Sequence, residues 1–210
     1  LGNVAIWDMA EKGLANALEK SGIKYGIKDK DGAFYGPKID IEIKDALGRK
    51  WQCPTVQLDF NLPERFNAKY EGQDGKKHSV VMIHRAVLGS IERFMGLLIE
   101  HMAGKFPLWL NPVQVIMLTV ADRHIEFAED LKKKMIDNGI RVELDTRAET
   151  IPKKVREAQL SQINYILVVG DKELENKTVN VRTRDNMVHG EKKVDIFIDE
   201  VLSEIKSKKI

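Results

Sequence analysis

Residues 84–94 read His-Arg-Ala-Val-Leu-Gly-Ser-Ile-Glu-Arg-Phe and join a short apolar segment to a longer one. We predict a strand over 80–83 and a helix over 85–103, buried because apolar residues occupy most of its circumference. Small residues and one arginine recur every three or four positions and would share a helix face: Ala86, Gly89, Ser90, Arg93 and Gly96. Such a face lets a ligand approach the backbone, and the guanidinium of Arg93 suits a base or a phosphate. Close packing on a strand, with Arg93 in an ion pair, is the alternative.

Towards the N-terminus, the sequence predicts a helix followed by a hairpin. The helix covers 7–21 and ends at Gly22. Isoleucines alternate with polar residues over 39–44, which is typical of a half-buried strand. After a turn, a second strand runs over 50–60 and bends at Pro54, because proline cannot donate to a strand ladder. The two strands are expected to pair antiparallel.

Residues 106–112 form a proline-bracketed aromatic connector, and we place a domain boundary there, between 110 and 111. After it, strands and helices alternate, which predicts a mixed, mainly parallel sheet flanked by helices. The expected strands and helices, in chain order, cover 113–120, 123–138, 140–144, 151–161, 165–169, 178–184 and 194–208. The fold class is therefore α/β, with domains over 1–110 and 111–210.

Composition limits the classes of protein to which the chain can belong. Its 210 residues are 43% hydrophobic and 31% charged, which is typical of a globular protein rather than a disordered one. The formal charge of +2 does not by itself predict nucleic-acid binding. A single cysteine, Cys53, favours a reducing, cytoplasmic location, and no apolar run is long enough to span a membrane. No signal peptide is recognised, and the start at Leu1 leads us to expect a piece of a longer protein.

Polar residues that could carry chemistry gather around the predicted hairpin. His84 could bind a metal or carry a proton, but zinc needs several ligands, and a capping or core histidine is the alternative. Cys53 is better interpreted as a buried strand thiol. Other polar groups suit a small ligand, although each alone could be an ordinary sheet residue: Tyr35, Lys38, Gln52 and Gln57. The sequence has no phosphate-binding loop, dinucleotide fingerprint, nucleophile elbow or paired-carboxylate motif.

Charged side chains also gather in the second half. One group lies near the helix predicted over 151–161: Arg147, Lys153, Lys154 and Arg156. Another follows the strand over 165–169 and continues onto the next strand: Lys172, Glu173, Arg182 and Arg184. Open parallel sheets bind ligands beyond the carboxyl ends of their strands, where cations could meet phosphates and Glu173 a base edge. A solvated charged surface is the alternative.

Several segments together resemble the threonyl-tRNA synthetases, a family of class II aminoacyl-tRNA synthetases. They are Phe-Tyr-Gly-Pro-Lys at 34–38, Trp-Gln-Cys at 51–53, Val-Gln-Leu-Asp-Phe at 56–60 and, above all, residues 84–94. The region 80–103 resembles motif 3 of that class, and the strand from Pro112 resembles the start of the anticodon-binding domain. The resemblance covers essentially the whole chain. It implies the end of an antiparallel class II catalytic domain over 1–110, followed by an anticodon-binding domain.

The resemblance implies roles in an active site. Arg93 corresponds to the arginine that stacks on the adenine of ATP and neutralises phosphate charge. Gly89 and Ser90 correspond to residues that line the adenylate pocket, and Tyr35 to one near the substrate amino group. The remaining polar residues match active-site positions, and Lys38 and Gln52 join Arg93 as the expected catalytic residues beside a substrate-binding Gln57.

The resemblance also implies a metal and an RNA partner. His84 matches one of three ligands of a zinc ion that binds the amino and hydroxyl groups of threonine and so excludes valine. Glu173 and Arg182 match contacts to the tRNA anticodon. Arg147 is a further candidate, although Ala148 stands where some relatives carry a polar residue.

Other parts of the family's pattern are not matched by this sequence: two zinc ligands, motif 1 with the dimer interface, motif 2 and the editing domain. We expect part of an enzyme that condenses threonine with ATP and Mg²⁺ and transfers it to tRNA(Thr), a homodimer through regions absent here and without membrane contact. Alone, the chain is expected to bind the anticodon, to hold zinc weakly and to be inactive in threonine activation. A non-catalytic tRNA-binding or regulatory remnant and an unrelated two-domain nucleotide binder are the alternatives.

Overall fold

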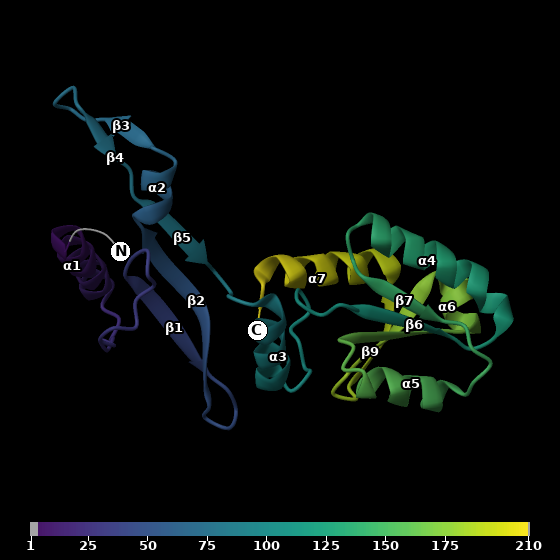
Figure 1. Cartoon of the computed structure of the whole chain (residues 1–210). Coiled ribbons are helices and arrows are strands. Elements are labelled where there is room, and N and C mark those ends of the chain that lie inside the picture. The colour runs from purple at the N-terminus through teal and green to yellow at the C-terminus, as the bar shows by residue number, and fades with distance from the viewer. Residues whose placement is uncertain (1–3, 210) are drawn as a thin grey trace. The chain divides into compact units, whose positions relative to one another are not determined.

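The computed structural model describes residues 4–209, and the chain forms two compact units that divide between His101 and Met102 (Figure 1). Each unit is described by itself. The aromatic connector belongs to the second unit, because Leu108 is buried in that unit's core. Among the described residues, no helix has the length and apolar character needed to cross a membrane.

The first unit is built around an antiparallel sheet with the strand order β1-β2-β5. The predicted hairpin is confirmed as β1 and β2, and β3 and β4 form a second hairpin that was not predicted. In chain order the elements are α1 (Val4–Ser21), β1 (Lys38–Lys44), β2 (Lys50–Asp59), α2 (Asn61–Arg65), β3 (Lys69–Glu71), β4 (Lys77–Ser79), β5 (Met82–Ala86) and α3 (Ile91–Met102).

The bend predicted at Pro54 is a β-bulge. Asp40 pairs with Thr55 and Glu42 pairs with Gln52, so one residue of β1 lies opposite Cys53 and Pro54 of β2. Proline has no N–H to donate to the ladder, so an unpaired extra residue at this position costs no further hydrogen bond. Because the bulge adds one residue, the Gln52 side chain lies on the same sheet face as the Thr55 side chain.

The helix predicted over 85–103 is wrong in its start and in its burial. β5 continues through Ala86, and α3 begins only at Ile91, because Gly89 has a positive φ of 72° and Ser90 Oγ accepts the N–H of Arg93 as a cap. Ala86, Gly89 and Ser90 therefore do not share a helix face with Arg93. Within the described chain no residue of α3 is buried, although its apolar pattern predicted a buried helix.

The second unit is a mixed sheet with the strand order β10-β9-β8-β6-β7. β6 pairs parallel with β7 and β8, whereas β9 pairs antiparallel with β8 and β10. The predicted mixed α/β fold is confirmed; α6 and β10 were not predicted. The elements are β6 (Val115–Thr119), η1 (Asp122–His124), α4 (Ile125–Asp137), β7 (Val142–Asp145), α5 (Ile151–Leu160), β8 (Tyr165–Val169), α6 (Asp171–Asn176), β9 (Thr178–Thr183), β10 (Val188–Lys193) and α7 (Val194–Ser207).

Helices cover both faces of this sheet (Figure 1). α4 and α7 pack on one face through a core that includes Met117, Leu167, Val181 and Phe197. On the opposite face, a smaller core joins α5 to β6 and β8. Because side chains alternate along a strand, β9 sends Val179 and Val181 into the first core and its intervening residues to the α5 face.

Candidate functional site

Polar residues line one face of the sheet in the first unit. Lys38, Gln57 and His84 lie directly opposite one another across β1, β2 and β5, so their side chains share a face. The bulge at Pro54 adds Gln52 to that face. Four residues that the sequence singled out separately are thus brought together by strand register.

Asp40 is the acceptor around which part of this face is organised. Its carboxylate accepts hydrogen bonds from Gln52 Nε2 at 2.6 Å and Thr55 Oγ1 at 3.1 Å, and its Oδ2 lies 2.7 Å from Lys38 Nζ. The hydrogen bond to Asp40 raises the pKa of Lys38, against the opposing effect of burial. The sequence analysis did not select Asp40, although its place in the alternating strand put it on the face of Lys38.

A second cluster is centred on Gln57, the β2 residue that lies opposite Lys38 and His84. Tyr35 Oη donates a hydrogen bond to Gln57 Oε1 at 2.7 Å, and the Tyr35 ring lies edge-on to the His84 ring with 6.2 Å between centroids. Gly36 allows this approach, because a Cβ there would lie 2.0 Å from the Leu58 oxygen. Tyr35 is thereby placed beside β2, where its hydroxyl and the Gln57 amide can bind a small polar group.

His84 is oriented by a buried carboxylate that the sequence analysis did not select. His84 Nε2 lies 2.8 Å from Asp59 Oδ2, while Asp59 Oδ1 accepts the N–H groups of Asn61 and Leu62. Burial acts to raise the pKa of Asp59, but the hydrogen bonds from His84 and the two amides outweigh it and lower that pKa. An imidazole that donates Nε2–H to a carboxylate keeps Nδ1 as an acceptor or ligand.

The residues present do not by themselves fit a zinc ion. Among the described residues, no group of three or more histidine, cysteine, aspartate or glutamate side chains is placed to hold a metal. Cys53 is buried in β2, as predicted for a strand thiol. His84 is therefore a single correctly oriented donor, whereas protein zinc sites use several. No chemical step of this chain can be assigned to zinc from these residues.

Arg93 and Gly89 approach the sheet from the segment after β5. Arg93 Nη1 donates a hydrogen bond to the Gln52 main-chain oxygen at 2.8 Å, and its guanidinium lies 5.6 Å from the centroid of the Trp51 ring. Gly89 passes so close to β2 that a Cβ would lie 2.3 Å from the Cys53 oxygen. This contact places Arg93 next to Gln52, with further guanidinium N–H groups able to meet an anion.

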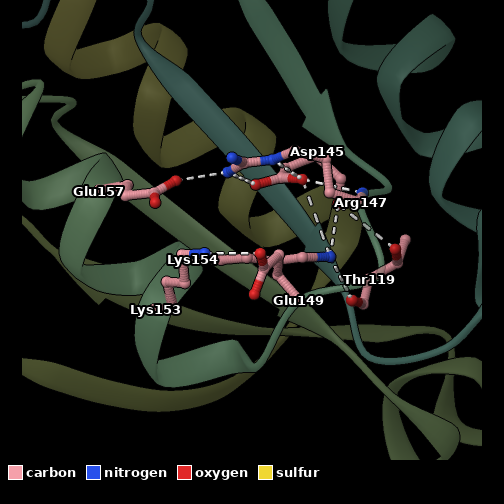
Figure 2. A network of polar contacts seen from close by, with 7 residues as sticks. All are labelled: Thr119, Asp145, Arg147, Glu149, Lys153, Lys154 and Glu157. Carbon is pink, nitrogen blue, oxygen red and sulfur yellow. Dashed lines mark hydrogen bonds and ion pairs between the residues drawn. The ribbon is translucent and has the colours of Figure 1, made fainter.

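In the second unit, Arg147 is part of an ion-pair network (Figure 2). Its Nη2 lies 2.6 Å from Asp145 Oδ2 and 2.6 Å from Glu157 Oε2. The hydrogen bonds to Asp145 and Glu157 raise the pKa of Arg147, and the hydrogen bond from Arg147 lowers that of Asp145. These residues line an open depression of about 500 Å³. Two carboxylates thus offset the charge that Arg147 would offer to an anionic ligand.

Lys154 is not part of a solvated basic surface. Its side chain is 1% exposed, and its Nζ donates to the main-chain oxygens of Thr119 and Asp145, each at 3.1 Å (Figure 2). Those oxygens belong to the carboxyl ends of β6 and β7, so Lys154 holds the two strand ends together. Hydrophobic periodicity does not predict this burial, because it treats the two adjacent lysines alike. Lys153 is in fact exposed and pairs with Glu149.

Glu173 and Arg182 differ in how they are held. Glu173 Oε2 accepts the N–H of Gly170 at 2.9 Å, at the start of α6. Asp171, the first residue of α6, binds both Arg123 and the buried His124. These contacts fix the start of α6 to the segment after β6. The Arg182 side chain, in contrast, makes no hydrogen bond or ion pair with residues 4–209, and its Nε is buried without a partner.

Comparison with known proteins assigns both units. Residues 6–102 match the family model "tRNA synthetase class II core domain (G, H, P, S and T)", and residues 113–208 match "Anticodon binding domain". A threonine–tRNA ligase of Natranaerobius thermophilus is 55% identical over 98% of this chain and 32% of its own length. One of Carboxydothermus hydrogenoformans is 54% identical over 100% of this chain and 33% of its own length.

A solved structure shares the fold. The RNA binding domain of threonyl-tRNA synthetase from Cryptosporidium parvum Iowa II has a TM-score of 0.88 and 43% identity, over 97% of this chain and 52% of that one. The chain spans about a third of the length of the curated relatives it matches. Both halves, and the resemblance carried by residues 84–94, lead to one assignment. The chain belongs to the threonyl-tRNA synthetases, a family of class II aminoacyl-tRNA synthetases.

Proposed function

We propose that this chain is part of a threonine–tRNA ligase, which activates threonine with ATP and transfers it to tRNA(Thr). The first unit would supply part of the activation site, and the second unit would bind the anticodon. The observation that supports this most directly is the shared polar face of Lys38, Gln52, Gln57 and His84, with Arg93 held beside it.

In the activation site, Arg93 would stack on the adenine and neutralise phosphate charge. Gly89 and Ser90 would line the adenylate pocket, and the close approach of Gly89 to Cys53 would hold this segment against β2. Lys38 and Gln52 would act as the polar catalytic groups beside Arg93. Fixed cations and dipoles of this kind, together with Mg²⁺ on ATP, stabilise charge that develops on the phosphates during activation.

Threonine would bind at the Tyr35 end of the polar face. Tyr35 and Gln57 would contact its polar groups, and His84 Nδ1 would be one ligand of a zinc ion that binds them directly. Further zinc ligands would have to come from outside the described residues, since these supply one oriented donor. The family's homodimer would likewise form through other regions. A cytoplasmic location follows from this role.

The second unit would bind the anticodon loop of tRNA(Thr). Arg182 has a guanidinium group that no described residue engages, so it would stack on or pair with a nucleotide. Glu173 would accept from a base edge with the carboxylate oxygen not used by Gly170. Arg147 would contact RNA only as far as its two carboxylate partners allow, which makes it a weaker contact than Arg182.

The experiment measures two activities of the purified chain. We expect binding to a stem–loop RNA with a threonine anticodon, and no threonine-dependent ATP–pyrophosphate exchange above background. Failure of the purified chain to bind this RNA would contradict the anticodon role. Threonine-dependent ATP–pyrophosphate exchange by the chain alone would contradict the proposal that it holds only part of the activation site.

A second candidate is a non-catalytic tRNA-binding or regulatory remnant of a synthetase. The two candidates differ in the gene, because only the enzyme requires a reading frame that continues upstream of Leu1 into motif 2.

A further inference from the structure

Two residues of β9 that are separated by Val181 carry buried polar atoms that lack partners. Asn180 and Arg182 are half-buried residues, but Asn180 Oδ1 and Arg182 Nε are themselves inaccessible to solvent and form no hydrogen bond within the described chain. Neither side chain makes any other hydrogen bond or ion pair with residues 4–209. Native proteins rarely leave buried donors and acceptors unpaired, so each such group needs an explanation.

The side chains next to this pair are engaged within the protein. Thr178 Oγ1 donates to Glu191 Oε1 at 2.5 Å, and Arg184 Nη1 donates to the Phe106 oxygen at 2.7 Å. Polar groups that flank the pair on the same strand are therefore used to build the unit. Asn180 and Arg182 are left with an acceptor and a donor that the fold does not use.

Strand register places the pair on one face, in line with Glu173. Asn180 lies opposite Val168 and Arg182 opposite Ile166, both of which belong to the core under α5. Gly170 continues the alternation of Ile166 and Val168, and a Cβ there would lie 3.2 Å from Glu173 Oε2. The Glu173 carboxylate therefore lies on the same side of the sheet, and Asn180 lies between it and Arg182 along the strands.

We propose that Asn180 is an RNA contact that reads the base edge of an anticodon-loop nucleotide between Glu173 and Arg182. An amide offers both a donor and an acceptor, which matches the edge of a splayed base better than a phosphate, which only accepts. Rotation about the Cβ–Cγ bond exchanges Oδ1 and Nδ2 and breaks no hydrogen bond, because the amide makes none within the described chain. The inference rests on the proposed anticodon role of this unit.

The test uses the whole chain and a synthetic stem–loop RNA with a threonine anticodon. Replacing Asn180→Ala should weaken binding about tenfold, the cost of losing one well-formed base contact. Thermal unfolding should show an unchanged or higher Tm, because no protein hydrogen bond is lost. Asn180→Leu keeps the volume and should behave in the same way. Asn138→Ala is the control for RNA affinity, since Asn138 follows α4 on the opposite face of the sheet. It should leave the affinity unchanged and lower the Tm, because Asn138 Nδ2 donates to the Lys134 oxygen at 2.8 Å.

Base reading predicts a further result. Exchanging each anticodon nucleotide in turn should reveal one position at which wild type discriminates and Asn180→Ala does not. Wild-type affinity in both variants would overturn the Asn180 proposal while leaving the anticodon role intact if Arg182→Ala still weakens binding. A fall in Tm that parallels the loss of affinity would also overturn it, since it would indicate a structural role. Absence of RNA binding by wild type would overturn the anticodon role as well.

Discussion

Lys154 Nζ lies 3.1 Å from the main-chain oxygen of Asp145, whose carboxylate binds Arg147. The same ammonium binds the Thr119 oxygen, so one buried charge joins β6 to β7 at their carboxyl ends. A charged group is retained in the interior only when its donors are satisfied, and here main-chain oxygens satisfy them. Asp145 is therefore held at its main-chain oxygen by the buried Lys154 and at its carboxylate by the exposed Arg147.

Replacing Lys154→Met should destabilise the second unit by about 3 kcal/mol, because it leaves two buried carbonyl oxygens without their donor. Urea unfolding followed by circular dichroism measures the change. Lys153→Met is the matched control: Lys153 is 51% exposed, and its loss should change the free energy of unfolding by about 0.5 kcal/mol or less. Equal effects of the two substitutions would contradict the role given to Lys154.

Gly89→Ala should destabilise the first unit by more than about 2 kcal/mol, because Gly89 has a positive φ and its Cβ would collide with the Cys53 oxygen. Gly96→Ala is the control within α3. A Cβ at Gly96 meets nothing within 4 Å, so alanine should stabilise the helix by about 0.5–1 kcal/mol. Chemical denaturation of the two variants beside wild type measures both changes. Wild-type stability of the Gly89→Ala variant would show that the close approach to Cys53 is not formed.

Asp45 should make the stability of the first unit depend on acid pH. The hydrogen bond from Trp51 Nε1, at 2.9 Å, and those from Arg49 lower the pKa of Asp45 from 3.8 to about 2, against the effect of burial. A carboxyl with a lowered folded-state pKa stabilises the fold above its unfolded pKa, and that contribution disappears as pH falls through the folded value. We expect the loss between about pH 4 and pH 2.

The measurement for Asp45 is NMR of the Trp51 indole N–H resonance during acid titration, with the pH dependence of unfolding recorded in parallel. Asp45→Asn should reduce stability at neutral pH and remove this part of the acid dependence. A Trp51 resonance that titrates near pH 4 would show that the hydrogen bond does not lower the Asp45 pKa.

Arg182→Ala and Arg184→Ala should have opposite consequences although the residues are two positions apart. Arg184 donates to the Phe106 oxygen, so its loss should cost about 2 kcal/mol of stability. The Arg182 side chain has no hydrogen-bond or ion-pair partner among residues 4–209, so its loss should leave stability unchanged and lower affinity for the anticodon stem–loop about tenfold. Thermal unfolding and RNA titration of both variants test the pair. Reduced stability of Arg182→Ala would assign that residue a structural role instead.

Local patterns predicted much of the second unit because its elements have strong periodicity and clear ends. The strand expected over 165–169 is Tyr165–Val169, and the helix expected over 151–161 is Ile151–Leu160. The helix expected over 85–103 shows where periodicity fails. Apolar spacing continues through the turn that contains Gly89, so the pattern alone could not show that the helix begins at Ile91.

By itself, the sequence determined the α/β class, the order of most strands and helices, the antiparallel first hairpin and the family, since these depend on local periodicity and on motif residues. Only the tertiary structure decided which side chains meet. Strand register and the bulge at Pro54 set the polar face of the first unit, and long-range folding buried Lys154 and oriented His84 against Asp59. Such pairings depend on residues far apart in the chain, for which no local pattern encodes a distance.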